Sequence, residues 1–214
     1  YIGSYNKNQM HELQGKISME MISFFYNKKE KDWIGVFHGS TLNKGNKSIM
    51  LTGESGSGKS SLTLILSSNG FKLIADDFSP MSNEMKHYKF PAAISVKEGF
   101  YSYANNLSKD FMNKKEYLVD KNKGKFKYFS LDIDNKSNSH NCNYIIDVKY
   151  GKHLKNNISM STKGKALQKL LPESWISETY NNSKKFYQWI HNSNFYELTY
   201  NDNKKAIELI NNIF

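Results

Sequence analysis

The sequence predicts an α/β fold, and a group of consecutive segments is the main reason. Residues 47–52 form a short apolar run between turn residues, which is typical of a buried strand. A loop rich in glycine and serine follows at 53–58, and residues 59–68 then carry enough leucine and isoleucine for a helix that ends at Gly70. Residues 71–75 predict a second buried strand. The order strand, loop, helix and strand indicates a βαβ unit.

The rest of the chain predicts shorter elements of both kinds. Expected helices lie at 17–26, 163–171, 173–191 and 203–213, and expected strands lie at 32–40, 126–129, 144–150 and 195–200. We also expect a turn at 41–46, a hairpin at 78–90, a mobile Lys- and Asn-rich excursion at 109–125 and a polar loop at 132–143. No internal repeat is present, so we expect one domain over residues 1–214, with residues 1–30 as a helical lead-in.

Composition and cysteine usage limit the class of protein. The chain has 214 residues, of which 38% are hydrophobic, and this suits one domain with a packed core. No apolar run reaches about 18 residues, so we expect no membrane-spanning helix and no membrane partner. A single cysteine, Cys142, excludes an internal disulfide and a zinc cluster, and no secretory signal is present, so we expect a cytoplasmic protein. Because the sequence begins with Tyr1 rather than Met, we expect that residues were removed or left out at this end.

The chain is strongly basic, and every basic residue is lysine. The net charge is +10, and none of the 30 Lys and Arg residues is arginine. One interpretation is a genomic bias toward AT-rich codons. The other is attraction to an anionic partner such as a nucleotide, an acidic peptide or a nucleic acid. Lysine lacks the bidentate fork that reads bases, and no aromatic–basic signature is present, so the sequence argues against a nucleic-acid partner.

A phosphate-binding motif gives the strongest functional signal. Residues 53–60 match G-x-x-x-x-G-K-[ST], between the expected strand and the expected helix. Glycines let the backbone N–H groups point at phosphate oxygens, and the following helix adds its positive N-terminal end. Lys59 would reach the β- and γ-phosphates, and the Ser60 hydroxyl would ligate Mg²⁺. The expected nucleotide-binding residues are Gly53, Glu54, Ser55, Gly56, Ser57, Gly58, Lys59, Ser60 and Ser61.

Two aspartates and a histidine are the further candidates for chemistry. Asp76 and Asp77 follow the strand at 71–75, where carboxylates can face a metal bound beside the phosphate loop. One of them would hold Mg²⁺, and the other could take the proton from an attacking hydroxyl. His38 ends the expected strand before the phosphate-loop strand. It is either a structural residue or, if the two strands pair, a group beside the γ-phosphate.

These residues together resemble a known family. The segments 38–40 (HGS), 53–66 (GESGSGKSSLTLIL) and 69–77 (NGFKLIADD) resemble the HPr kinase/phosphorylase family, and most closely its shorter relatives linked to peptide modification. That fold is related to the ATP-dependent phosphoenolpyruvate carboxykinases. Segments 89–91 (KFP) and 94–99 (ISVKEG) are similar to the short relatives in the region after the paired aspartates.

The resemblance implies a kinase core with a mixed sheet flanked by helices, and phosphoryl transfer from ATP to a serine hydroxyl. Carried over by position, Lys59 and Ser60 hold phosphate and metal, and His38 assists. We assign Asp76 to the metal and Asp77 to the base, with the exchange of these two roles left open. The expected cofactors are therefore ATP and Mg²⁺, and the expected partner is a serine-bearing peptide or protein. The family also tends to assemble, which raises the prospect of a homo-oligomer.

Departures from the family pattern leave other functions open. The HPr kinases carry an arginine-bearing signature in their C-terminal half, where this chain has the lysine-only stretch 148–152. The resemblance therefore leaves open both the carrier-protein acceptor and the reverse phosphorylase reaction. A small-metabolite kinase is one alternative, although many close an arginine-rich lid that this chain cannot build. A nucleotide-binding regulator that does not transfer phosphate is the other.

Overall fold

Helices and strands alternate along most of the chain. The computed structural model describes residues 3–6, 9–90, 92–118, 124–131 and 137–213. The helices are α1 (Met10–Phe25), α2 (Lys59–Ser67), α3 (Tyr101–Leu107), α4 (Lys163–Leu170), α5 (Tyr180–Asn192) and α6 (Asn203–Asn211). Short 3₁₀ helices are η2 (Glu30–Asp32), η3 (Glu98–Phe100), η4 (Lys109–Asn113) and η5 (Leu171–Glu173). The strands are β1 (Trp33–Phe37), β2 (Ser40–Lys44), β3 (Lys47–Thr52), β4 (Lys72–Ala75), β5 (Ser79–Ser82), β6 (Lys86–Tyr88), β7 (Ile94–Lys97), β8 (Glu116–Leu118), β9 (Lys125–Phe129), β10 (Ser139–Asn141), β11 (Tyr144–Tyr150), β12 (Asn157–Met160), β13 (Ser174–Ile176) and β14 (Asn194–Tyr200).

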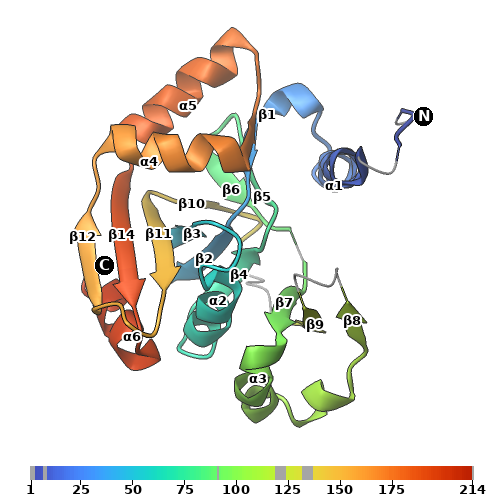
Figure 1. The fold of residues 1–214 in the computed structure, drawn as a ribbon. Coiled ribbons are helices and arrows are strands. Elements are labelled where there is room, and N and C mark those ends of the chain that lie inside the picture. Colours follow the sequence, from blue (N-terminus) through green and yellow to red (C-terminus); the bar gives the residue numbers. More distant parts are fainter. Residues whose placement is uncertain (1–2, 7–8, 91, 119–123, 132–136, 214) are drawn as a thin grey trace.

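A mixed sheet with the strand order β12-β14-β11-β3-β2-β4 forms the centre of the molecule (Figure 1). Strand β11 runs parallel to both β3 and β14, whereas β2 and β12 run antiparallel to their neighbours. Two smaller sheets, β10-β6-β5-β1-β13 and β7-β9-β8, lie beside it. The expected α/β fold, with sheets flanked by helices, is confirmed.

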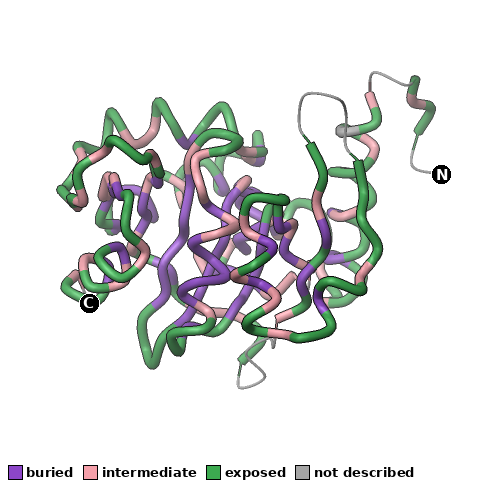
Figure 2. The backbone as a smooth tube through the Cα atoms, turned by 60° about the horizontal axis from the view of Figure 1, so that its bottom comes forward, coloured by how far each residue is buried: buried purple, intermediate pink, exposed green. Residues whose placement is uncertain are grey.

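The central sheet is buried on both faces because its strands alternate their side chains between two cores. Ile49 and Leu51 of β3 pack with α2 and α6 on one face, whereas Met50 packs with β1, β5, α4 and α5 on the other. Strand β11 repeats the pattern, with Ile146 on the first face and Ile145 on the second. Figure 2 shows the buried backbone concentrated in these central strands. The phosphate loop therefore follows a strand in the interior of a sheet that is buried on both faces.

The expected βαβ unit is present, but an additional strand lies inside it. Strands β3 and β4 both pair antiparallel with β2, so they run parallel to each other on either side of it. Residues 32–40 were expected as one strand and 41–46 as a turn, and this is wrong. Strand β1 ends at Phe37, the chain crosses to the central sheet at 38–39, and β2 occupies 40–44 before a two-residue turn at Gly45.

Four other expectations need correction. The helix expected at 173–191 begins only at Tyr180, because β13 precedes it and the Thr179 side chain caps it by accepting from the Asn182 backbone N–H. The excursion expected at 109–125 contains η4 and β8, and its Phe111 is fully buried; residues 119–123 lie outside the described residues. The loop expected at 132–143 contains β10, and residues 132–136 lie outside the described residues. The first helix extends further toward the N-terminus than expected.

The remaining elements match the expectations within a few residues. The hairpin at 78–90 is formed by β5 and β6, and strands β9, β11 and β14 lie where they were expected. Helices α4 and α6 also occupy the expected segments. Among the described residues, no helix has the length and apolar character needed to cross a membrane.

A buried histidine makes the second core sensitive to acid. His87 lies with its ring centroid 5.7 Å from those of Phe37 and Trp189, and its Nδ1 is 3.1 Å from Ser79 Oγ. Complete burial lowers the pKa of His87 to about 3, because the imidazolium would lose its hydration there. The folded protein therefore keeps His87 neutral at pH values where the unfolded chain protonates it.

We expect acid to destabilise the protein through His87. This contribution is fully present above about pH 6.5 and is lost as the pH falls toward 3, with a slope approaching about 1.4 kcal/mol per pH unit. Urea unfolding at neutral pH and at about pH 5 measures it. His87→Gln should remove this part of the acid loss, and the exposed control His153→Gln should keep it. Equal acid losses in the wild type and in His87→Gln would contradict the assignment.

Candidate active site

The glycine- and serine-rich loop lies between β3 and α2, as its motif requires. Gly58 caps α2 with a φ of 101°, and a β-carbon there would lie 2.9 Å from Tyr150 Cβ. Only glycine fits this conformation and this space. The loop is closed by a hydrogen bond from Ser57 N to Glu54 O (3.1 Å) and is held to the end of β11 by one from Tyr150 N to Ser57 O (2.8 Å). These two bonds hold the loop backbone at Glu54 and Ser57.

Lys59 is a buried cation at the floor of this loop. Its side chain is 6% exposed, and its Nζ donates to the carbonyls of Gly53 (2.5 Å) and Glu54 (3.3 Å). Burial lowers the pKa of Lys59, and the carboxylates of Asp77 and Glu173, among others, partly offset this effect. A phosphate that enters the loop therefore meets a poorly hydrated ammonium group, which strengthens their attraction.

The two neighbouring aspartates occupy different environments. Asp76 is 1% exposed, its Oδ1 accepts a hydrogen bond from Ser40 Oγ, and its Oδ2 is buried with no partner among the described residues. Burial, with the adjacent Asp77, raises the pKa of Asp76 to about 7. Asp77 has a φ of 59°, and its half-exposed side chain lies 3.9 Å from His38 Nε2. The left-handed backbone turns Asp77 out of the core that holds Asp76.

His38 and Ser40 are placed by a close passage between two sheets. The backbone N–H of His38 donates to Glu173 O (2.9 Å), which fixes the crossing chain to η5. At Gly39 a β-carbon would lie 2.7 Å from Leu51 O of the phosphate-loop strand, so the crossing requires glycine. The crossing brings His38 to the surface beside Asp77 and Ser40 into the core beside Asp76.

Three adjoining cavities surround these residues. The phosphate cleft, of about 300 Å³, is lined by the loop and by His38, Asp77 and Lys97. The side cleft, of about 270 Å³, shares Gly58, Ser61, Lys97 and Tyr150 with it and adds Phe100, Tyr200 and Asn203. The α1 groove, of about 720 Å³, lies between α1 and the segment 172–175, and it shares His38 and Asp77 with the phosphate cleft. His38 and Asp77 therefore lie where two cavities meet.

The structure brings together most of the residues that the sequence singled out. Those that line the phosphate cleft are His38, Ser55, Gly56, Gly58, Lys59, Ser60, Ser61 and Asp77. Gly53, Glu54 and Ser57 belong to the loop without lining the cleft, and Asp76 lies behind it.

Four residues of the site were missed by the sequence. They are Ser40, which donates to Asp76, Lys97 and Tyr150 of the phosphate cleft, and Glu173, which contributes to the field at Lys59. Ser40 belongs to the HGS segment and could have been noticed there. Lys97 and Tyr150 lie in segments 94–99 and 148–152, which were noted in the sequence, but neither segment indicated a role for them. No local pattern marks Glu173.

The donor set fits Mg²⁺ bound together with a nucleotide. No group of three or more His, Cys, Asp or Glu suited to a metal is found among the described residues. Mg²⁺ usually needs only one or two protein oxygens, because substrate phosphates and waters complete its shell. The unpartnered Oδ2 of Asp76 and the Ser60 hydroxyl are oxygen donors of the right kind.

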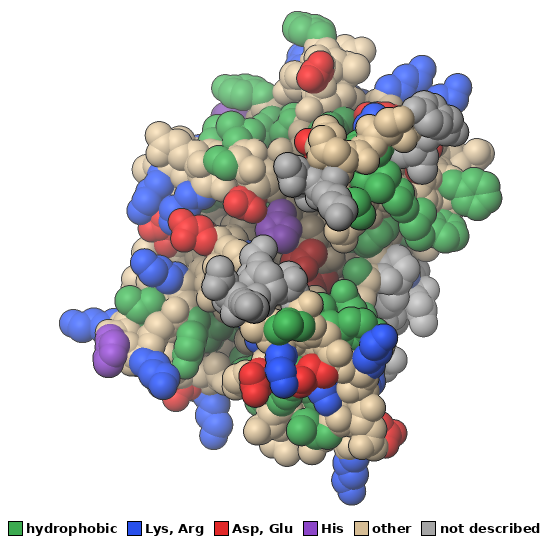
Figure 3. Space-filling model, turned by 45° about the vertical axis from the view of Figure 1, so that its right-hand side comes forward, with side chains coloured by type: hydrophobic (Ala, Val, Ile, Leu, Met, Phe, Trp, Pro, Cys, Tyr) green, Lys and Arg blue, Asp and Glu red, His purple; other side chains and the backbone are tan. Residues whose placement is uncertain are grey.

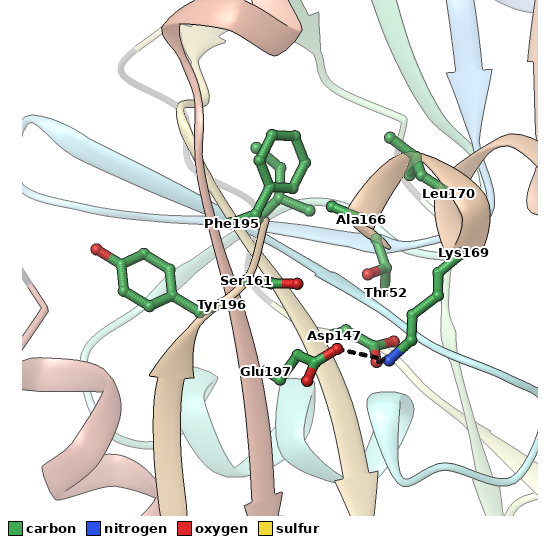
Figure 4. A pocket seen from close by; sticks show the side chains of 10 residues that line it. Thr52, Asp147, Ser161, Ala166, Lys169, Leu170, Phe195, Tyr196 and Glu197 are labelled. Carbon is green, nitrogen blue, oxygen red and sulfur yellow. Dashed lines mark hydrogen bonds and ion pairs between the residues drawn. The ribbon is translucent and has the colours of Figure 1, made fainter. Parts of the chain in front are cut away.

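A third carboxylate near the loop is already engaged. Asp147 of β11 lies opposite Thr52, and Figure 4 shows Lys169 of α4 reaching toward Asp147 and Glu197. Lys169 Nζ donates to Asp147 Oδ2 and, at 3.0 Å, to Glu197 Oε1. The cavity between them has about 10 Å³, which is room for about one water. This cluster ties α4 to the sheet and is not a ligand site.

Comparisons with known proteins give distant similarities in structure only. No family model matches the sequence, and no curated protein matches it. Among solved structures, the Hpr(Ser) kinase/phosphatase from Coxiella burnetii is similar, with 15% sequence identity and a TM-score of 0.38 over 83% of this chain and 95% of that chain. A likeness at this level carries no functional argument, so the function must be argued from the residues of the site.

Removing the Ser40 hydroxyl should destabilise the ionised form of Asp76 and, with it, the folded protein. Ser40→Ala deprives the ionised carboxylate of its hydrogen bond, which should lower the free energy of unfolding by about 1–3 kcal/mol. The cost should be larger above pH 7 than below it, because the pKa of Asp76 is about 7 and the hydroxyl stabilises the ionised form. Urea unfolding on both sides of pH 7 measures it. In an Asp76→Asn background the pH dependence should vanish, and its persistence there would refute the pairing.

Proposed function

We propose that this protein is an ATP- and Mg²⁺-dependent kinase that transfers the γ-phosphoryl group to a hydroxyl, with serine of a peptide or protein as the acceptor. The observation that carries the proposal is the shared cleft. Lys59 and Ser60 of the phosphate-binding motif face the same cavity as Asp77 and His38. Phosphate binding and proton transfer therefore meet in one place. The motif resemblance to the HPr kinases supports the same class of reaction.

The adjoining cavities suggest how the nucleotide lies. The triphosphate occupies the phosphate cleft, with its terminal phosphates against the loop N–H groups and Lys59. The nucleoside occupies the side cleft, where Phe100 and Tyr150 supply aromatic surfaces for a base. Lys97 lines both cavities and adds a positive charge beside the phosphates. In a chain without arginine, lysines must supply this charge.

Asp77 lines both the phosphate cleft and the α1 groove, so it is placed to act between the nucleotide and the acceptor in the proposed reaction. The acceptor oxygen enters from the α1 groove and attacks the γ-phosphorus, while the bond from that phosphorus to the β,γ-bridging oxygen breaks and its electron pair stays on the departing ADP. The hydroxyl proton passes to the Asp77 carboxylate. His38, within 3.9 Å of Asp77, would orient this carboxylate and assist the proton transfer. Lys59 stabilises the charge on the transferred group.

Ser60 and Asp76 would hold the magnesium ion. A bound Mg²⁺ would neutralise negative charge on the nucleotide phosphates. An ion at Asp76 Oδ2 would also give that buried oxygen the partner that it otherwise lacks.

Lys59→Ala should abolish transfer and leave the fold intact. With γ-labelled ATP, Mg²⁺ and serine-bearing peptides, the wild type should label an acceptor and the variant should lose at least about 10²-fold in rate. The exposed control Lys72→Ala should keep the wild-type rate. An unchanged rate of phosphoryl transfer in Lys59→Ala would contradict the proposed mechanism. ATP binding by the wild type with no transfer to any acceptor would favour a nucleotide-binding regulator.

Asp77→Asn should separate binding from chemistry. Asn tolerates the left-handed backbone at this position and matches the shape of Asp, so ATP affinity should be unchanged. The turnover rate should fall by about 10²–10⁴-fold because the proton acceptor is gone.

Asp76→Asn should instead raise the Mg²⁺ concentration needed for half-maximal activity. Calorimetry with ATP and rates across a Mg²⁺ titration distinguish the two. The reverse pattern would exchange the two roles.

A further inference from the structure

The α1 groove adjoins the phosphate cleft at His38 and Asp77. It shares His38 and Asp77 with the phosphate cleft and has a volume of about 720 Å³, more than twice that of the cleft. Small-molecule sites commonly have about 300–1,000 Å³, and a free amino acid would fill only part of this space. A hydroxyl carried by a larger occupant of the groove would lie beside Asp77.

The groove is acidic in a chain that is otherwise strongly basic. Carboxylates line it from both walls, and they belong to Glu12, Glu20, Glu30, Asp77 and Glu173. Lys16 is the one lysine in the lining, against a net charge of +10 for the whole chain. Within the described part of the chain, Glu20, Glu30 and Glu173 form no ion pair that would neutralise them. Figure 3, which brings the side with α1 forward, shows a hollow with acidic side chains and a histidine.

Between the carboxylates the groove offers apolar surface. Met19 of α1, Val36 of β1, Phe78 and the partly exposed Trp175 contribute to its lining. A surface of this kind suits a peptide that presents both charged and apolar side chains, rather than a small polar metabolite.

Helix α1 is a fixed wall of the groove. Met19 and Ile22 pack into a small core with Trp33 and Tyr88. The hydrogen bond from Trp33 Nε1 to Ser23 Oγ (2.9 Å) is buried and holds the same face of the helix. The groove is thus formed without a partner.

We propose that the α1 groove binds the acceptor as a peptide segment with lysine or arginine side chains next to the accepting serine. The inference rests on the proposed kinase function for the transfer step, but peptide binding can be measured without it. Cationic side chains pair with Glu20, Glu30 and Glu173, apolar side chains cover Trp175 and Met19, and the serine hydroxyl reaches Asp77. Recognition is by complementary charge, which sets specificity more than affinity.

A pair of labelled peptides tests the charge of the acceptor. Each carries a central serine between leucines, flanked either by lysines or by glutamates, and fluorescence anisotropy measures binding at low salt. The net charge of +10 alone favours the glutamate peptide, whereas the groove favours the lysine peptide. We expect the lysine peptide to bind about tenfold tighter, and Glu20→Lys to remove most of that preference. Equal binding, or tighter binding of the glutamate peptide, would overturn the proposal.

A groove-filling variant tests the location. Gly15 of α1 lines the groove, and a β-carbon there would meet no atom within 4 Å, so Gly15→Trp should fold and fill the groove. It should weaken binding of the lysine peptide by about tenfold or more and leave ATP affinity unchanged. Gly164→Trp in α4 is the matched control, because Gly164 is equally unobstructed and lies outside the groove. Unchanged peptide binding in Gly15→Trp would refute the site.

Labelled phosphate separates the two proposals. If the lysine peptide binds the groove and receives no phosphate from γ-labelled ATP, the groove inference stands and the kinase proposal fails. If phosphate is transferred to peptides regardless of their charge, and Gly15→Trp transfers it as well as the wild type does, the kinase stands and the groove inference fails.

Discussion

The site depends on how closely the chain passes the phosphate-loop strand at Gly39. A side chain at that position would collide with Leu51 O, so the crossing from β1 to β2 can lie against β3 only with glycine there. This contact sets His38 on the surface beside Asp77 and Ser40 in the core beside Asp76. Because β2 then lies between β3 and β4, the aspartates at the end of β4 come to the same edge as the loop. One backbone contact thus aligns three segments that carry the chemistry.

The site contains a cluster of carboxylates although the chain as a whole is strongly basic. The chain carries +10, yet Lys59 is surrounded by the carboxylates of Asp76, Asp77 and Glu173, and the α1 groove is acidic. Lys59 and Lys97 line the phosphate cleft together with Asp77, whereas five carboxylates and one lysine line the α1 groove. A nucleotide and a cationic acceptor would each meet the opposite charge as they enter. The lysine-rich composition, which genomic bias alone could produce, does not predict this arrangement.

The parts of the site that could be predicted from sequence are those whose signal lies in consecutive residues. The loop at 53–60 and the aspartates at 76–77 carry their chemistry in one short segment each, and their neighbouring strands are apolar. Strand β2 was missed because Thr41 and Asn43 are polar but buried, satisfied by Ser79 Oγ at 2.5 Å and by Ser48 Oγ at 3.1 Å. A hydrophobic pattern cannot reveal such a strand. Strand β13 and the groove depend on pairing between distant segments, which no local pattern encodes.

The different surroundings of Asp76 and Asp77 show how backbone conformation can separate two identical side chains. Both follow β4, yet Asp76 stays in the core, where burial raises its pKa to about 7 and leaves one oxygen without a partner. A buried carboxylate of this kind is stabilised by a cation more than by water, which suits a metal ligand. At Asp77 the φ of 59° turns the side chain into the opening shared by two cavities, where a proton can be exchanged with an entering hydroxyl. Since Asn also adopts this backbone readily, an amide at position 77 would keep the geometry and remove the proposed base. The two roles that we propose for Asp76 and Asp77 would therefore follow from the turn at Asp77 rather than from any difference in carboxyl chemistry.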